Sequence, residues 1–105
     1  MKRALGLIGL CMRAGRISLG TPNAEKAIRS GTAKLVLLDG GASANTRKAI
    51  ADACSYRKVP LETLPPDLLG SAVGRPGRMC AAVTDEGFAE QIQKRLREAG
   101  KSITD

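Results

Sequence analysis

The feature that most constrains the fold is Lys34-Leu-Val-Leu-Leu-Asp39, a run that is almost entirely apolar. A half-buried strand alternates apolar and polar residues, because successive side chains point to opposite faces of a sheet. A short apolar run without alternation is typical of a strand that is buried on both faces. We therefore expect it to lie in the middle of a covered sheet.

Helical and strand patterns alternate along the rest of the chain, with no repeat and no linker. Strands are predicted at residues 17–19, 34–39, 59–64 and 79–84. Helices are predicted near residues 2–13, over Thr21–Ser30, after Ser43 with Ala49, Ile50, Ala53 and Cys54 on the buried face, between Pro66 and Gly74, and after a cap at Thr84 or Asp85. This alternation predicts an α/β protein, a three-layer α/β/α sandwich. We expect a single domain over residues 1–100 and a frayed tail at 101–105.

The charge of the chain favours an anionic partner. Its 105 residues carry a net charge of +7, which points first to RNA or DNA. No apolar run approaches the roughly 18 residues that span a bilayer. We therefore expect a cytoplasmic protein with no membrane partner.

The cysteine and histidine content argues against metal and covalent chemistry. The three cysteines, Cys11, Cys54 and Cys80, are far apart and lie among apolar residues, and the chain has no histidine. Zinc ligands at such spacing are not expected, and histidine-dependent nucleophile pairs are excluded. We expect three buried thiols in a reducing compartment, no metal and no cofactor.

The start of the second predicted helix is the main candidate for a binding site. Gly20 can adopt backbone angles closed to other residues, Thr21 is a plausible N-cap, and Pro22 follows where a missing N–H is tolerated. The unpaired N–H groups and positive dipole end of such a helix favour phosphate. Asn23 and Lys26 fall on one face of it. An ordinary capped surface helix would have the same sequence features.

Three kinds of function remain open. Tyr56 and Phe88 are the only aromatic residues. Domains that bind single-stranded nucleic acid stack the bases on aromatic side chains, so this composition favours a folded RNA, ribosomal or other. A protein-interaction module without RNA would scatter its basic residues and expose an apolar patch. A small-ligand α/β enzyme, the least favoured of the three, would need a deep pocket at the Asp39–Ala42 turn. We therefore expect a non-catalytic RNA-binding protein, whose candidate contacts are Arg13, Arg16, Gly20, Thr21, Asn23, Lys26, Arg29, Arg75, Gly77 and Arg78.

Several motifs, taken in order, resemble one protein family. They are Gly20-Thr21-x-x-x-x-Lys26, the Leu-Val-Leu-Leu-Asp strand, Cys54-x-x-x-Lys58-Val59-Pro60 and Leu69-Gly70-x-Ala72-x-Gly74. Together they resemble the ribosomal protein L7Ae and L30e family, and its small bacterial members most of all. The resemblance covers residues 4–98. It implies an α/β/α sandwich with a four-stranded mixed sheet and, in many relatives, recognition of kink-turn RNA.

The resemblance also implies particular site residues. The family's RNA-reading motif is Gly-x-Asn-Glu-x-x-Lys, which Gly20 and Lys26 match. Pro22 stands where the family usually has asparagine, and Asn23 where it has glutamate or glutamine. The second contact loop of the family carries an apolar residue, where this chain has the charged turn Arg75-Pro-Gly-Arg78. These departures leave phosphate binding plausible.

Overall fold

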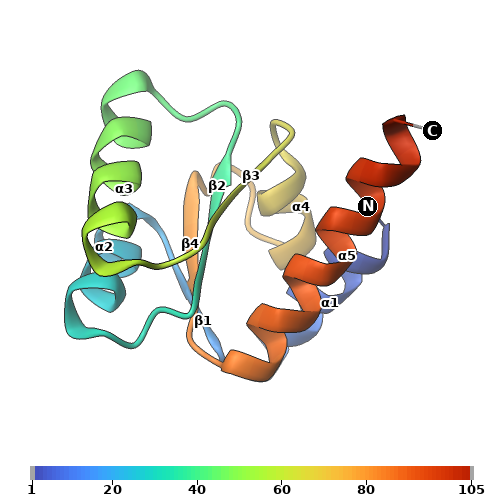
Figure 1. Cartoon of the computed structure of the whole chain (residues 1–105), viewed down its shortest axis with the longest axis horizontal. Coiled ribbons are helices and arrows are strands. Elements are labelled where there is room, and N and C mark those ends of the chain that lie inside the picture. Colours follow the sequence, from blue (N-terminus) through green and yellow to red (C-terminus); the bar gives the residue numbers. More distant parts are fainter. Residues whose placement is uncertain (1, 105) are drawn as a thin grey trace.

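The structure is a computed structural model that describes the backbone of residues 2–104 and the side chains of residues 2–99. Helices and strands alternate as the sequence predicts (Figure 1). The helices are α1 (Lys2–Arg13), α2 (Thr21–Ser30), α3 (Ala44–Arg57), α4 (Leu68–Val73) and α5 (Glu86–Thr104). The strands are β1 (Ile17–Leu19), β2 (Leu35–Asp39), β3 (Leu61–Leu64) and β4 (Cys80–Val83). The tail expected at 101–105 falls on the last turn of α5 and on residue 105, which lies outside the described residues.

The four strands form one mixed sheet in the order β1-β4-β2-β3. β2 pairs in parallel with β3 and antiparallel with β4, and β4 pairs antiparallel with β1. All residues of the central strands β2 and β4 are buried. The prediction from the apolar run is therefore confirmed, and so is the expected mixed four-stranded sheet.

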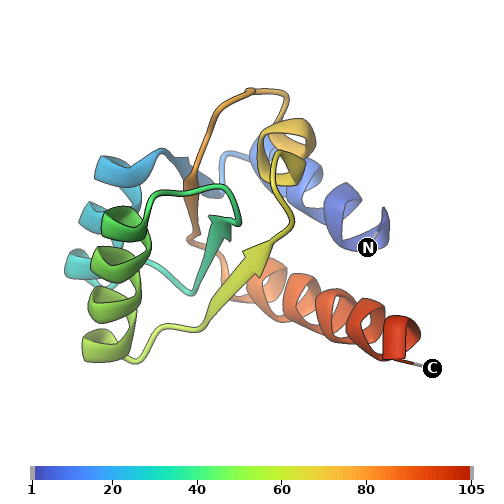
Figure 2. The same cartoon turned by 90° about the horizontal axis from the view of Figure 1, so that it is seen from above.

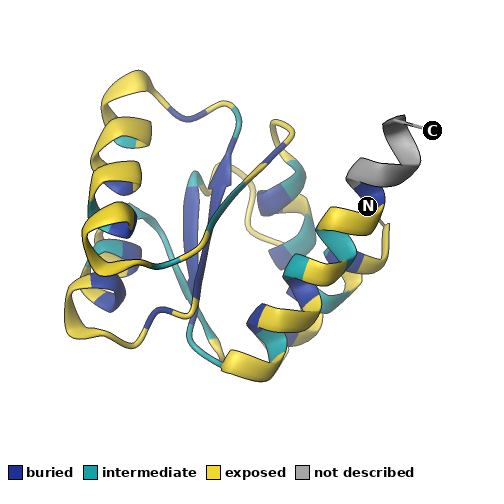
Figure 3. Ribbon diagram, in the orientation of Figure 1, coloured by how far each residue is buried: buried dark blue, intermediate teal, exposed yellow. Residues whose placement is uncertain are grey.

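Helices cover both faces of this sheet and complete the three layers (Figures 1 and 2). Leu35 and Leu37 of β2 pack into one hydrophobic cluster with α1, α4 and α5. Val36 and Leu38 pack into a second cluster with α2 and α3. Buried residues line the sheet and the inward sides of the helices (Figure 3). The α/β/α sandwich is thus held by two cores that share one sheet.

Two local expectations need correction. The third strand begins at Leu61 rather than at residue 59, because the N–H of Val59 still bonds the carbonyl of Cys54 and closes the end of α3. Ala49 was expected on the buried face of α3 but is exposed. Only Ile50 and Cys54 of that helix are fully buried, since α3 packs mainly through one narrow stripe.

The three cysteines are free and buried, as predicted. Burial raises the pKa of Cys11 and of Cys54 to about 11, and that of Cys80 to about 12. These thiols are therefore protonated near neutral pH and pack as small apolar groups.

Asp39 is the one buried charged residue among the described side chains, with 1% of its surface exposed. Its Oδ2 accepts a hydrogen bond from the N–H of Gly41 at 2.8 Å, and its Oδ1 accepts one from the N–H of Asp67 at 2.8 Å. The carboxylate therefore joins the β2–α3 loop to the β3–α4 loop. Because both oxygens are engaged with backbone, Asp39 holds two loops in place at the end of the sheet.

We expect Asp39→Asn to lower the free energy of unfolding by about 2–4 kcal/mol, because the amide can no longer accept on both sides. Urea denaturation followed by circular dichroism measures this change. Asp52→Asn is the matched control: it makes the same substitution at an exposed position of α3 and should shift stability by less than about 0.5 kcal/mol. Equal stability of the two variants would contradict the role given to Asp39.

Candidate nucleic-acid interface

The site is built around Gly20, which joins β1 to α2. Gly20 has φ 93° and ψ 151°, a backbone conformation that is essentially restricted to glycine. Gly20 is also the N-cap of α2, and the expectation that Thr21 caps the helix is wrong. Thr21 is the first helical residue, because the carbonyl of Gly20 already accepts the N–H of Ala24. Without a side-chain cap, the start of α2 presents backbone to the surface.

Asn23 and Lys26 share one face of α2, as their spacing predicts. Both line a polar hollow of about 290 Å³, together with Ser18, Ala27, Ser30 and Thr32. The Nδ2 of Asn23 donates to the carbonyl of Leu19 at 2.8 Å. This bond orients the amide and leaves its Oδ1 as the atom that can accept from a ligand. The hollow thus combines an oriented amide with a lysine ammonium and several hydroxyls.

The loop between α4 and β4 lies next to Gly20. The N–H of Gly20 donates to the carbonyl of Cys80 at 2.8 Å, directly after that loop, and the N–H of Asp39 donates to the carbonyl of Met79 at 2.8 Å. Figure 2 shows the loop arching over the end of the sheet where α2 begins. We call this the Gly20 end of the sheet: β1, β2 and β3 finish there and β4 begins there.

Because Gly70 of α4 has no side chain, the backbone of the charged turn packs directly against this helix. A Cβ at Gly70 would lie 2.9 Å from the carbonyl oxygen of Arg75 and 3.1 Å from the Cα of Pro76. The N–H of Arg75 donates to the carbonyl of Gly70 at 2.9 Å. The turn is therefore fixed at its base, and Arg75, Gly77 and Arg78 are exposed above it.

The structure brings seven of the ten candidate residues to the Gly20 end. They are Gly20, Thr21, Asn23, Lys26, Arg75, Gly77 and Arg78.

The other three candidates lie elsewhere. Arg16 precedes β1 at the opposite end of the sheet, where its carbonyl accepts from the backbone N–H and Oγ1 of Thr84. Arg13 ends α1 and lines a hollow with α5 residues. Arg29 lies in the last turn of α2 and pairs with Glu25 at 3.7 Å.

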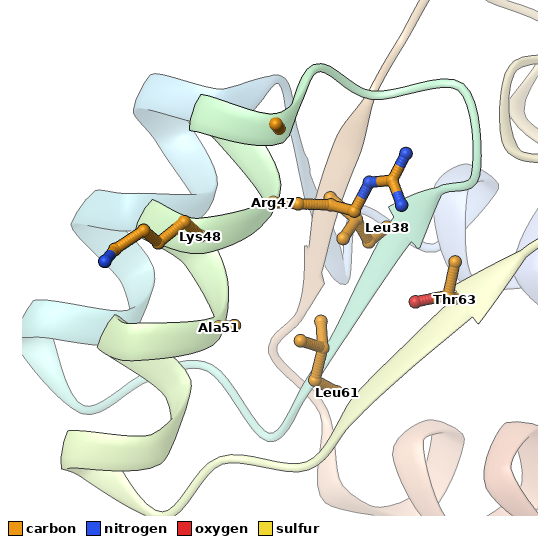
Figure 4. Close-up of a pocket in the computed structure, with 7 residues that line it drawn as sticks. Leu38, Arg47, Lys48, Ala51, Leu61 and Thr63 are labelled. Carbon is orange, nitrogen blue, oxygen red and sulfur yellow. The ribbon is translucent and has the colours of Figure 1, made fainter.

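A residue that the sequence reasoning missed is Arg47 of α3. Its guanidinium donates to the carbonyls of Gly40 and Ala42, and so fixes the β2–α3 loop at the Gly20 end. The signal in the sequence that could have identified Arg47 was its position one helical turn after the Ser43 cap. Arg47 and Lys48 also border a groove between α3 and β3 of about 520 Å³, with Leu38 and Leu61 below (Figure 4).

The enzyme alternative requires a deep pocket at the Asp39–Ala42 turn, and the protein-interaction alternative requires an exposed apolar patch. The groove of Figure 4 is lined by α3, β2 and β3 side chains rather than by the Asp39–Ala42 turn. Leu10 and Tyr56 are the exposed large hydrophobic residues of the described part, and they stand on separate helices. Within residues 2–104 no helix is long and apolar enough to cross a membrane. The described side chains form no group of three or more metal-binding residues.

Comparison with known proteins shows which proteins the chain is similar to. The family model described as the ribosomal protein L7Ae/L30e/S12e/Gadd45 family matches residues 2–93. The chain is 42% identical over 87 residues to the RNA-binding protein YlxQ of Bacillus subtilis, covering 82% of this chain and 87% of that relative. It is 35% identical over 94 residues to the RNA-binding protein YlxQ of Enterococcus faecium, covering 89% and 90%.

A solved structure shares this fold. It is a protein of unknown function from Bacillus halodurans, which superposes with a TM-score of 0.83 at 30% identity and covers 87% of this chain and 93% of its own. The family resemblance and the fold that it implied are therefore confirmed. With a family model that spans nearly all of its length and relatives of similar size, the chain belongs to the ribosomal protein L7Ae/L30e/S12e/Gadd45 family.

Proposed function

We propose that this protein is a non-catalytic, cytoplasmic RNA-binding protein that binds a folded RNA at the Gly20 end of the sheet. The observation that carries the proposal is the hydrogen bond from Gly20 to Cys80, which places the start of α2 beside the Arg75–Arg78 turn. Two relatives at 42% and 35% identity are named as RNA-binding proteins. The net charge of +7 supports an anionic partner.

The two parts of the surface do different work in this proposal. The first turn of α2 offers backbone N–H groups and the positive end of its dipole, and Asn23 and Lys26 lie beside it. These groups suit base edges and phosphates in an opened, kinked region of RNA. Arg75 and Arg78 are exposed on a glycine-containing turn and suit phosphates, which position an RNA without reading its sequence.

Recognition of a kink-turn belongs to the proposal, in a weakened form. Pro22 cannot supply the side-chain amide of the family motif, and Asn23 is shorter than the glutamate or glutamine that it replaces. The Nδ2 of Asn23 also donates a hydrogen bond to the carbonyl of Leu19, so it is already engaged within the protein. We therefore propose that shape and phosphate contacts dominate over base reading. An association with the ribosome or with translation is consistent with the family description.

Affinity for RNA should fall steeply as salt is added. If the three basic side chains of this surface, Lys26, Arg75 and Arg78, contact phosphates, the plot of log affinity against log salt concentration should have a slope of about −2 to −3. Fluorescence anisotropy with a labelled kink-turn RNA, between 50 and 300 mM KCl, would measure it. A slope near zero would contradict a phosphate-dominated surface.

Lys26→Ala should weaken binding to a kink-turn by about 1–3 kcal/mol, because a charge-assisted hydrogen bond is lost. Lys94→Ala on α5 is the matched control and should leave the affinity unchanged.

Arg78→Ala should weaken binding to a kink-turn and binding to an unkinked duplex to similar extents, because phosphate contacts carry little sequence information. Unchanged binding by both Lys26→Ala and Arg78→Ala would place the RNA on another surface.

Gly70→Ala tests the support of the charged turn. The new methyl group would meet the backbone of Arg75 at 2.9 Å, so the turn must move. We expect a stability loss of about 1–3 kcal/mol and a weaker RNA affinity in variant protein that is still folded.

The control for this variant is Gly6→Ala on α1, where nothing lies within 4 Å of the added carbon. There stability should stay level or rise by up to about 1 kcal/mol, since alanine favours a helix. If Gly70→Ala and Gly6→Ala have the same RNA affinity, the position of the turn does not matter for binding.

A further inference from the structure

A second cationic surface lies at the opposite end of the sheet, away from the proposed RNA contacts. There the C-terminal ends of α2 and α3 meet the segments that lead into β2 and β3, at the lower left of Figure 1. Tyr56, in the last turn of α3, is 83% exposed. The guanidinium carbon of Arg57 lies 5.7 Å from the centroid of its ring. An aromatic ring is therefore presented to solvent with a cation against it.

Arg57 also borders a hollow of about 340 Å³, and it is the residue that links this hollow to the Tyr56 ring. Its apolar lining comes from Ile28, Ala33, Val59 and Pro60, and its charged lining from Lys34, Arg57 and Lys58. None of the described side chains that line it is acidic. The volume lies at the lower end of the range of about 300–1,000 Å³ found for ligand sites.

The backbone fixes the position of these cations. Lys58 adopts a left-handed conformation, with φ 57°, and closes α3 through bonds from its N–H to the carbonyls of Cys54 and Ser55. Pro60 follows, and its carbonyl accepts the N–H of Val36 in β2. The Lys58–Pro60 segment is thus held between a helix end and a strand.

The net field of the hollow favours an anion. The C-terminal ends of α2 and α3 each contribute roughly half a negative charge. Lys34, Arg57 and Lys58 contribute three full positive charges at the same place. The cations therefore outweigh the helix dipoles.

We propose that this surface binds one unpaired nucleotide of an RNA, with its phosphate on Lys34, Arg57 and Lys58 and its base stacked on Tyr56. A cationic groove beside an exposed aromatic ring is the combination that binds single-stranded nucleic acid without sequence preference. The carboxylates of an acidic peptide would pair with the cations but would make no stacking contact with the Tyr56 ring. A nucleotide can make both contacts, so RNA is the better match.

This site lies about the length of α2, ~15 Å, from the start of that helix. It adds a contact for an unpaired flank to the folded-RNA surface proposed above. It can also be tested without a folded RNA, so the two proposals can fail separately.

The chain offers a direct probe, because Tyr56 is its only tyrosine. Protein labelled with 3-fluorotyrosine will give a single fluorine resonance in NMR. Titration with an eight-nucleotide oligouridylate should shift this resonance with a saturable dependence on concentration.

Lys58→Gly should raise the apparent Kd by about fivefold or more. It removes one charge at a positive φ that suits glycine, so the fold is preserved.

Two more variants separate stacking from charge. Tyr56→Leu should weaken oligouridylate binding by about fivefold or more, the change that corresponds to roughly 1 kcal/mol of lost stacking. Tyr56→Phe should bind like the unmodified protein, because the ring is kept. Lys26→Ala, at the other end of the sheet, should leave the shift of the labelled protein unchanged.

Three results would overturn the inference. The first is a fluorine resonance that stays fixed while anisotropy shows that the oligonucleotide is bound. The second is an equal shift with polyglutamate of the same charge, which would make the surface a general anion site. The third is binding by Tyr56→Leu that matches the unmodified protein. Each can occur while Lys26→Ala still weakens kink-turn binding, so the folded-RNA proposal is judged on its own experiments.

Discussion

The rest of the structure depends on the burial of β2 and β4 on both faces. Strands that carry apolar side chains in both directions cannot leave either face in water without a large free-energy penalty. Two layers of helices are therefore required, and the chain supplies α2 and α3 for one face and α1, α4 and α5 for the other. Because the centre of the sheet is closed in this way, loops at its two ends are the accessible places where polar groups can gather.

The pairing of the strands decides which loops meet. β4 runs antiparallel to both β1 and β2, so its first residue lies beside the last residues of its two neighbours. This brings the start of α2 and the turn that precedes β4 to one end of the sheet. Asp39 then joins the two other loops at that end, β2–α3 and β3–α4, and Arg47 fixes the first of them through bonds to backbone carbonyls. The same protein backbone that closes the sheet thus shapes the proposed RNA surface.

Two clusters of basic residues lie at opposite ends of the sheet. Lys26, Arg75 and Arg78 lie on the proposed folded-RNA surface, whereas Lys34, Arg57 and Lys58 lie at the other end beside Tyr56. Two cationic regions on opposite ends of a sheet four strands wide can hold a long, folded polyanion at separate points. A charge excess that served solubility alone would require no aromatic ring beside one of its clusters.

The sequence by itself determined the local features. The unbroken apolar run specified a strand that is buried on both faces. Ser43 was predicted to cap one helix, and its side chain accepts a hydrogen bond from a backbone N–H of that helix. Of the two residues predicted as caps of the last helix, Thr84 and Asp85, it is Asp85 that accepts such a bond. These features were predictable because they depend on neighbours within one turn or one strand. The spacing of Asn23 and Lys26 also placed them correctly on one face of α2.

Only the tertiary structure decided how the segments meet. The sequence grouped Arg13, Arg16 and Arg29 with the Gly20 site, but strand direction sends Arg16 to the opposite end, and Glu25 pairs with Arg29. The cap at Gly20 rather than Thr21, the contact of Gly70 with the charged turn, and the gathering of Lys34 with Lys58 were equally hidden. All of them depend on strand register and on the approach of backbones far apart in sequence. Such contacts leave no periodic signal along the chain, because they are set by the packing of whole elements.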